Sequence, residues 1–379
     1  MNIYSDGEHE MFRTEYRRFV RQEIMPIAAK VDEVGEFPLE VLRELGRMGY
    51  LCIQLPEQYG GSGADAMMLV IAAEEMAYAS SGIDASLLVH SIIAVNPIFR
   101  FGSAEQREQY LPRAASGRAV AAIAMTEPDA GSDVASIRTS ARRDGDGYVI
   151  NGTKMFITNG TIADFVVVAA RTGEPGHRGI SLFIVDAGTP GFRATRRLEK
   201  LGWRASDTAE LVFDDCTVPA DSLIGEEGRG FYYLMENLNL ERIVMAADCL
   251  GLARAAIDQA KSYALERRQF GRAIASFQEI RFMIVDMEAR LRAAELLTYD
   301  AAWKLQMGGD CTMEASMARY VAGEMVNRVT GDAIQIHGGY GFMMESDVQR
   351  FYRDARVMTI GGGTSQIQKE VIARKLGLG

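Results

Sequence analysis

The chain has 379 residues, of which 48% are hydrophobic and 24% charged, enough for a large core and two or three domains. Lysine and arginine number 41 against 51 aspartate and glutamate, and the net charge of −10 argues against nucleic acids and anionic membrane surfaces as partners. The cysteines are scattered without a CxxC pair, and the four histidines lack ligand spacing. We therefore expect a reducing, cytoplasmic location and no metal site.

The N-terminus is polar and acidic, which argues against a signal peptide. The longest apolar runs, such as residues 165–170, are too short to span a membrane, so we expect no integral membrane segment.

Residues 8–118 show helical periodicity. Apolar residues recur at three- and four-residue steps up to about Gly35, and a second helix is predicted to start at Pro38. Two later segments, MMLVIAAEEMAYASSG and ASLLVHSIIAVNPIFRFG, are apolar on all sides, which is typical of buried helices. His90 lies in the second of these, and we interpret it as a satisfied core residue without a catalytic role.

Residues 120–223 instead contain short apolar or alternating runs separated by Gly, Asn, Asp and Pro, which predicts strands. The clearest runs are GYVINGTKMFITNG, DFVVVAAR, ISLFIVDA and AELVFDDCTV. The segment RRDGDGYVINGTKMFITNG predicts a hairpin with DGDG at its turn. This part of the chain is expected to form a small all-β domain.

From Gly230 onward the pattern is helical again, in long segments. The first is predicted to run without a break to Gly271, and Ser276 is predicted to cap the next one. Helices of this length pack as a four-helix type of bundle. We therefore predict three domains, over residues 1–119, 120–228 and 229–379.

Six segments carry a resemblance to a known family. In chain order they are AMTEPDAGSD (124–133), KMFITNG (154–160), LGWRASDTAELVFDDCTVP (201–219), ERRQFGRAIASFQ (266–278), QIHGGYGF (335–342) and GTSQIQ (363–368). Their order and spacing are similar to those of the acyl-CoA dehydrogenases over essentially the whole chain. No GxGxxG follows a predicted strand, so a Rossmann nucleotide domain is not supported.

The resemblance implies an α+β multi-domain fold, with an N-terminal α-helical domain, a small middle β-barrel or sandwich, and a C-terminal four-helix bundle. It also implies an FAD-dependent enzyme that converts an acyl-CoA thioester to the trans-2-enoyl-CoA, with the hydride passing to flavin N5. Electrons would then pass to an electron-transfer flavoprotein. In this family some cofactor contacts come from a neighbouring subunit, which implies a homo-oligomer, and we expect a homotetramer.

The resemblance assigns one set of residues to the flavin ring and its surroundings. The backbone at Met125 and Thr126 would bind the pyrimidine edge of the ring. Thr158 would donate toward N5, and Phe156 would lie against the ring, although ordinary strand packing is an alternative for Phe156. Ser132 would lie between the flavin chain and the pantetheine arm of the substrate.

A second set would hold the remainder of the cofactor. Arg267, Phe270 and Gln278 are assigned to the pyrophosphate and adenine end, and an arginine suits this because its guanidinium binds phosphate oxygens in a fixed fork. The alternative for Arg267 is a solvated helix face. The further assignments are close backbone approach at Gln335, Gly338 and Gly339, and adenosine contacts from Thr364 and Gln366.

The catalytic base is the least usual feature. Many relatives carry a glutamate at the position of Gly362, where it removes the α-proton, and the backbone N–H of that residue polarises the thioester carbonyl. Gly362 retains only the N–H. Glu241, followed by Arg242, is similar to the base that isovaleryl-CoA and long-chain members of the family carry in a bundle helix, so Glu241 is predicted to be the base. The alternative is a surface charge pair.

The remaining substrate contacts are assigned to Ser132, Asn239, Arg242 and Gly361. Glycine at 361 and 362 leaves room for a branched or bulky acyl group. Three alternatives stay open: a flavin-dependent monooxygenase or oxidase on the same fold, an enzyme acting on acyl carrier protein thioesters, and a silent acyl-thioester or flavin-binding protein.

Overall fold

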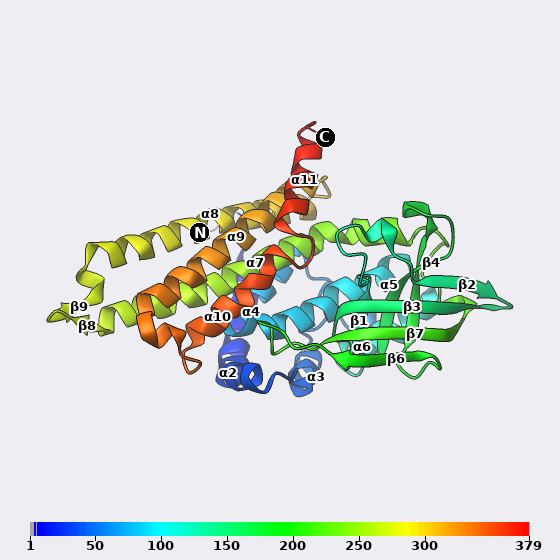
Figure 1. The fold of residues 1–379 in the computed structure, drawn as a ribbon, viewed down its shortest axis with the longest axis horizontal. Coiled ribbons are helices and arrows are strands. Elements are labelled where there is room, and N and C mark those ends of the chain that lie inside the picture. Colours follow the sequence, from blue (N-terminus) through cyan, green and yellow to red (C-terminus); the bar gives the residue numbers. More distant parts are fainter. Residues whose placement is uncertain (1–3, 5, 379) are drawn as a thin grey trace.

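The structure is a computed structural model that describes residue 4 and residues 6–378. The molecule is elongated, with a sheet at one end and a small hairpin at the other, and long helices connect the two (Figure 1). The helices that precede the sheet are α1 (Gly7–Phe19), α2 (Met25–Val34), α3 (Leu39–Arg47), α4 (Ala66–Leu88), α5 (Val95–Phe101) and α6 (Ala104–Ala115).

Local sequence signals explain where several of these helices begin. The Asp6 side chain accepts hydrogen bonds from the backbone N–H groups of Glu8 and His9, and His9 completes a capping box. Ser103 and Gln106 form a second capping box at the start of α6. The predicted end of the first helical segment is confirmed, because Gly35 closes α2 with a left-handed φ of 76°.

We expected every apolar run to be too short to span a membrane, but an apolar helix at 66–101 is longer than that. It runs through α4, a π-helical turn at Val89–Ala94 (η3) and α5, and by length and hydropathy it could cross a membrane. However, 83% of its most apolar window is buried within the protein, as in a core helix. Its length escaped detection because polar residues such as Ser80, where the backbone departs from helical geometry, interrupt the apolar run.

A single seven-stranded sheet forms the middle of the chain. The strands are β1 (Ala121–Ala124), β2 (Ser140–Asp144), β3 (Gly147–Thr158), β4 (Phe165–Arg171), β5 (Ile180–Asp186), β6 (Phe192–Arg197) and β7 (Thr208–Pro219). Their order is β1-β4-β2-β3-β7-β6, and β5 pairs with β4. The predicted hairpin is confirmed, since β2 and β3 pair in antiparallel fashion from Asp144 opposite Gly147, around Gly145 with φ 56°.

The remaining helices are α7 (Gly230–Glu266), α8 (Gln278–Gln306), α9 (Thr312–His337), α10 (Asp347–Ala355) and α11 (Ser365–Lys375). Two predicted boundaries were wrong. The helix from Gly230 ends at Glu266, because a two-stranded hairpin, β8 (Arg268–Gln269) with β9 (Arg272–Ala273), reverses the chain there. Ser276 does not cap α8: its hydroxyl donates to the carbonyl of Ala273 within a 3-10 turn.

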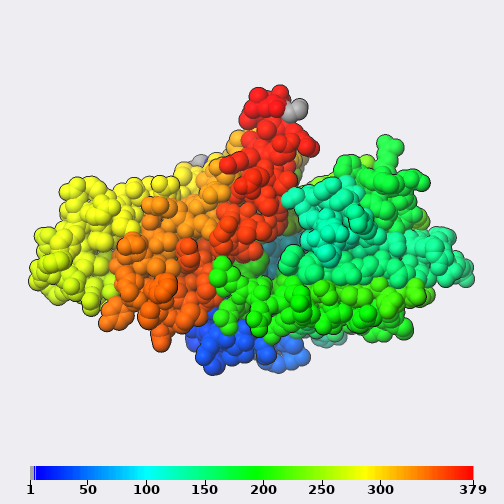
Figure 2. All heavy atoms as spheres, in the orientation of Figure 1, coloured from blue at the N-terminus to red at the C-terminus, as the bar shows by residue number. Residues whose placement is uncertain are grey.

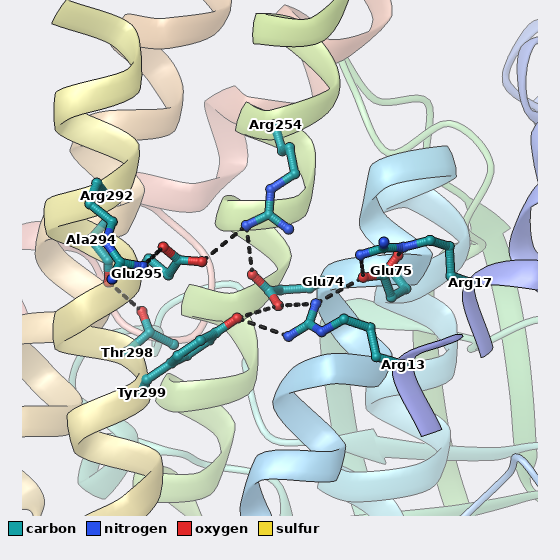
Figure 3. Close-up of polar contacts among 10 residues, drawn as sticks. All are labelled: Arg13, Arg17, Glu74, Glu75, Arg254, Arg292, Ala294, Glu295, Thr298 and Tyr299. Atoms are coloured by element: carbon teal, nitrogen blue, oxygen red, sulfur yellow. Dashed lines mark hydrogen bonds and ion pairs between the residues drawn. The ribbon is translucent and has the colours of Figure 1, made fainter. Parts of the chain in front are cut away.

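A buried polar network joins α1, α4, α7 and α8 (Figure 3). The Glu74 side chain, fully buried, accepts from Arg13 at 2.8 Å, from Arg254 at 3.3 Å and from the Tyr299 hydroxyl at 2.7 Å. Glu75 accepts from Arg13 and Arg17. Because removing one member would leave buried charges unpaired, the network fixes how the first helices dock on the long C-terminal ones.

Candidate active site

Segments far apart in the sequence meet around a central cavity of about 580 Å³. Its walls come from the helix at 85–93, the end of β1 and the loop after it, β3, the 198–208 loop, α7 and the 357–364 segment. On the outside, the C-terminal segment and the sheet border a depression between them (Figure 2). We call the cavity of about 580 Å³ the central cavity.

A buried ion pair shapes the loop after β1. Lys154 on β3 is fully buried, and its ammonium group donates to Glu127 at 2.8 Å and to the Met125 carbonyl at 3.0 Å. Burial lowers the pKa of Lys154 to about 8, against the charge of Glu127. The Met155 N–H also donates to the Thr126 carbonyl. These bonds hold the backbone at 125–126 against the cavity.

A β-bulge turns one aromatic side chain into the central cavity. The pairing of β3 with β7 shifts register between Lys154 and Ile157. Phe156 lies in this bulge with φ 62°, a strained value for a bulky residue, and its side chain remains 66% exposed. Thr158, two residues on, lines the same wall. Backbone strain of this kind is concentrated at functional sites.

Glu241 faces the central cavity from α7. It is 5% exposed, and its carboxylate accepts no hydrogen bond from any residue that the structure describes. Burial raises its pKa to about 7, although Arg242 and Arg319 act in the opposite direction. The side chain is therefore a buried, unpaired carboxyl group poised near neutrality, which suits a general base.

The triple-glycine loop lies directly opposite Glu241. Arg319, buried in α9, donates to the carbonyls of Met358 and Gly361, and Gln368 donates to those of Gly362 and Gly363. The Gly362 N–H, by contrast, has no acceptor within the described part of the chain. The loop is thus fixed through its carbonyls, and the Gly362 N–H stays available.

Gly362 has little space for a side chain. Its φ of 62° favours glycine, and a Cβ atom there would lie 2.4 Å from the sulfur of Met245 and 3.2 Å from Oε1 of Glu241. The Glu241 carboxylate therefore occupies the space toward which a side chain at 362 would point.

A second cavity, of about 590 Å³, lies at the far end of the long helices, beside the β8–β9 hairpin. We call this the distal cavity. Arg267, Phe270, Gly338 and Gly339 line it, and the Arg267 guanidinium lies 5.6 Å from the centre of the Tyr340 ring. Arg267, the residue that follows α7, lies 26 residues after Glu241, a rise of about 39 Å at 1.5 Å per residue, so the two cavities are far apart along this helix.

The predicted site residues thus fall into three groups. Nine line the central cavity: Met125, Thr126, Ser132, Phe156, Thr158, Glu241, Gly361, Gly362 and Thr364. Four line the distal cavity, and the other five are not among the lining residues of either: Asn239, Arg242, Gln278, Gln335 and Gln366.

Some of these residues already have partners. The Thr364 hydroxyl caps α11 by accepting from the Ile367 N–H. Arg242 donates to Asn239, whose amide donates in turn to Thr312 at the start of α9. The Nε atom of Arg242 is buried and has no partner among the described residues, which leaves one donor free.

Four residues of the central site were missed from the sequence: Lys200, Trp203, Met245 and Arg319. Lys200 and Trp203 are within or beside the quoted 201–219 segment, so position relative to a motif could have drawn attention to them. Burial lowers the pKa of Lys200 to about 8. Arg319 shares a helix face with Ala315, Ala322 and Val326, and a charge on an apolar face is a signal that helical periodicity could have supplied.

The residues of the central cavity fit a flavin ring. An exposed aromatic side chain on a strained backbone, apolar walls from Leu88, Ile93 and Val357, and a few hydroxyl groups match a planar, mostly apolar heterocycle with polar edges. His90, in contrast, is a neutral core residue as predicted: it accepts from the Ala121 N–H and bonds the Ala114 carbonyl, and burial lowers its pKa to about 4.

Comparison with known proteins agrees with this arrangement. Models of the N-terminal, middle and C-terminal domains of acyl-CoA dehydrogenases match residues 6–118, 122–216 and 228–377. An acyl-CoA dehydrogenase of Bacillus subtilis is 44% identical over 97% of this chain and 98% of its own length. The Acetobacterium woodii protein described as caffeyl-CoA reductase-Etf complex subunit CarC is 41% identical, over 99% of both chains.

The structure of butyryl-CoA dehydrogenase from Megasphaera elsdenii superimposes with a TM-score of 0.96, at 38% identity, over 99% of this chain and 100% of that one. The predicted succession of helical, sheet and helical domains is confirmed by this likeness. The chain belongs to the acyl-CoA dehydrogenase family, whose members are FAD-containing oxidoreductases that act on a CH–CH bond of acyl-CoA thioesters.

Proposed function

We propose that this protein oxidises an acyl-CoA thioester to the trans-2-enoyl-CoA, with Glu241 as the base that removes the α-proton. The observation that carries the proposal is the position of Glu241 Oε1, 3.2 Å from the point where a side chain on Gly362 would begin. A carboxylate delivered from α7 therefore reaches the region that a glutamate at 362 would serve in other family members.

The surroundings of Glu241 support this role. A base must be ionised at the working pH yet basic enough to accept a carbon-bound proton, and a pKa raised to about 7 meets both needs. The free N–H of Gly362 is the donor that we assign to the thioester carbonyl oxygen. A donor fixed there before reaction stabilises negative charge as the α-proton leaves.

FAD supplies the acceptor for the β-hydride when it is bound in the central cavity. Phe156 and Thr158 would hold its ring, the backbone at 125–126 would bind its pyrimidine edge, and Ser132 would separate it from the pantetheine arm. Closed between α7 and the sheet, the ring and the acyl group would exclude water from Glu241.

We further propose that the distal cavity binds the adenine and pyrophosphate end of FAD held by a neighbouring subunit. The separation of about 39 Å along α7 between Glu241 and Arg267 supports a role for Arg267 toward the cofactor of another chain. The proposed assembly is a homotetramer. Exposed apolar side chains on α8, Phe282, Val285, Leu296 and Trp303, are suited to an interface with other copies.

Electron-transfer flavoprotein is the proposed electron acceptor. The support is the Etf complex named for the Acetobacterium woodii relative. That relative is described as a reductase, so the direction of net reaction in this protein depends on its partner as well as on its site. An oxidase or monooxygenase, or an acyl carrier protein substrate, are the competing proposals.

The test is anaerobic bleaching of the purified flavoprotein by a panel of acyl-CoAs of different length and branching. We expect one or more to reduce the flavin and yield the enoyl-CoA, whereas acetyl-CoA, which has no β-carbon, should not. Matched acyl carrier protein thioesters separate the two carriers. Rapid reaction of the reduced flavin with oxygen would favour an oxidase, and no bleaching by any thioester would contradict the proposal.

A further inference from the structure

We propose that Asp84 and Asp248 share one proton and, through Ser81, fix the indole of Trp203 as a wall of the central cavity. These are positioning residues, since only Trp203 reaches the cavity. The inference rests on the proposed function only for the statement that this wall is part of the substrate and cofactor site.

A continuous chain of hydrogen bonds connects these side chains. The Trp203 Nε1–H donates to the Ser81 hydroxyl at 2.8 Å. Ser81 donates to Asp248 on α7, with distances of 2.8 and 3.0 Å to its two oxygens. Asp84 follows Ser81 by three residues in α4, so its carboxyl group lies on the same helix face, and Asp84 and Asp248 act on each other's pKa. Ser81, Asp84 and Asp248 are all buried.

The bonding pattern locates the proton. Two ionised carboxylates side by side offer no donor to each other, and Asp84 Oδ2 is buried without a donor from any residue that the structure describes. A proton on Asp84 supplies that donor, and it leaves Asp248 ionised to accept from both Ser81 and Asp84. Burial and the charge of Asp248 raise the pKa of Asp84 well above its usual range, and burial raises that of Asp248 to about 7.

Charged and titratable groups from several helices face the pair. Tyr16 of α1 lies near Asp84, and burial raises its pKa strongly. Asp354 of α10 and Arg319 of α9 act on Asp248 in opposite directions. Arg319 is already bonded to the glycine loop and does not donate to the pair. Within the described part of the chain no cation forms an ion pair with either carboxyl group, so retaining one proton avoids two buried, unpaired charges.

The backbone around Trp203 needs this support. Trp203 has φ 51°, an unusual value for a bulky residue, and its N–H donates to Asp354 at 2.6 Å. α4 packs tightly beside it, since a Cβ on Gly82 would lie 3.3 Å from the Trp203 Cα. Because its backbone N–H is bonded to buried Asp354 and its indole N–H is bonded to Ser81, which donates to buried Asp248, the ring is held in one orientation against the cavity.

The test uses the emission of Trp203 in the holoenzyme. The chain has two tryptophans, so Trp303→Phe leaves Trp203 as the only one, after light scattering has confirmed an unchanged oligomer. In that background Ser81→Ala should shift the emission maximum and increase acrylamide quenching. It should also raise KM for the best acyl-CoA by roughly 5–30-fold, the value of one buried hydrogen bond, while kcat changes less.

Matched variants test whether Asp84 and Asp248 share a proton. Ser86→Ala removes a buried hydroxyl of the same helix for which the described residues provide no partner, and it should change neither emission nor KM. Asp84→Asn keeps a donor toward Asp248 and should stay near the parent in emission and thermal stability. Asp84→Leu should shift the emission maximum and lower the thermal stability. Equal damage from Asn and Leu would overturn the shared proton. Unchanged emission in Ser81→Ala would overturn the positioning role, and this readout needs no substrate, so it is independent of the proposed function.

Discussion

The central and distal cavities have nearly the same volume, about 580 and 590 Å³, but they differ in how the chain encloses them. The central cavity is built from all three parts of the sequence and contains a buried, unpaired carboxyl group. The distal cavity is bordered by one end of the long helices, where Phe270 is 92% and Tyr340 62% exposed. The two cavities are therefore distinguished by how completely the chain encloses them and not by their volume.

The difference also indicates which binding site a single chain can form without a partner. In the distal cavity, exposed aromatic side chains lie beside an arginine on an open surface. A partner that covered them would remove their apolar area from water, which is favourable. The walls of the central cavity, by contrast, are fixed within the chain by the buried pair of Lys154 with Glu127 and by hydrogen bonds of the glycine loop. If this comparison is right, chemistry should depend on the central residues, and cofactor retention should depend on the distal ones.

The largest expected effect is at the base. Glu241→Gln preserves shape and should fold and retain FAD, but it removes the proton acceptor. We expect anaerobic flavin reduction by the best acyl-CoA to slow by about 10²–10⁴-fold in single-turnover experiments. A rate within a few-fold of the parent would place the base elsewhere and remove the main distinction between the cavities.

The next effect concerns the distal cavity. Arg267→Ala should weaken FAD retention by about 10–150-fold, the equivalent of roughly 1.5–3 kcal/mol for a charged hydrogen bond to phosphate. Flavin occupancy is measured after gel filtration and dilution, with the neighbouring Arg268→Ala as the control. Full occupancy of the Arg267 variant would contradict its assignment. Flavin reduction in the fraction that retains FAD should stay close to the parent.

The glycine loop offers a gain-of-function test of the central cavity. In the Glu241→Gln background, Gly362→Glu alone should restore little, because its Cβ would lie 2.4 Å from the Met245 sulfur and φ at 362 is left-handed. Adding Met245→Ala removes that clash, and we expect at least about a tenfold recovery of flavin reduction as a positioned base returns. Met245→Ala in Glu241→Gln without the new glutamate is the control. No recovery in the triple variant would argue that the two positions do not serve the same carbon.

Much of this comparison could be predicted from the sequence. The helix, sheet and helix pattern followed from periodicity, and the pairing of Glu241 with Gly362 followed from a family resemblance. The location of Arg267 at the opposite end was also implicit, since one predicted helix separated it from Glu241. What could not be predicted is set by tertiary contacts: the bulge that exposes Phe156, the sulfur of Met245 beside Gly362, and the carbonyls that Arg319 holds have no local signature.

The smallest expected effect is on pH dependence, and it separates the cavities without any large loss of function. Burial raises the pKa of Glu241 to about 7, and only its ionised form accepts the α-proton, so flavin reduction should rise with pH and level off above that value. Between about pH 6.5 and pH 8 a single group of this pKa gives roughly a fourfold increase.

FAD retention should stay flat over the same interval, because burial lowers the pKa of His337, which lines the distal cavity, and keeps it neutral. Stopped-flow reduction and FAD occupancy are therefore measured on the same protein at each pH. The residual rate of Glu241→Gln should not show the increase. If it does, another group controls the proton, and if FAD occupancy follows the same curve as the rate, the two cavities titrate together and cannot be treated as separate sites.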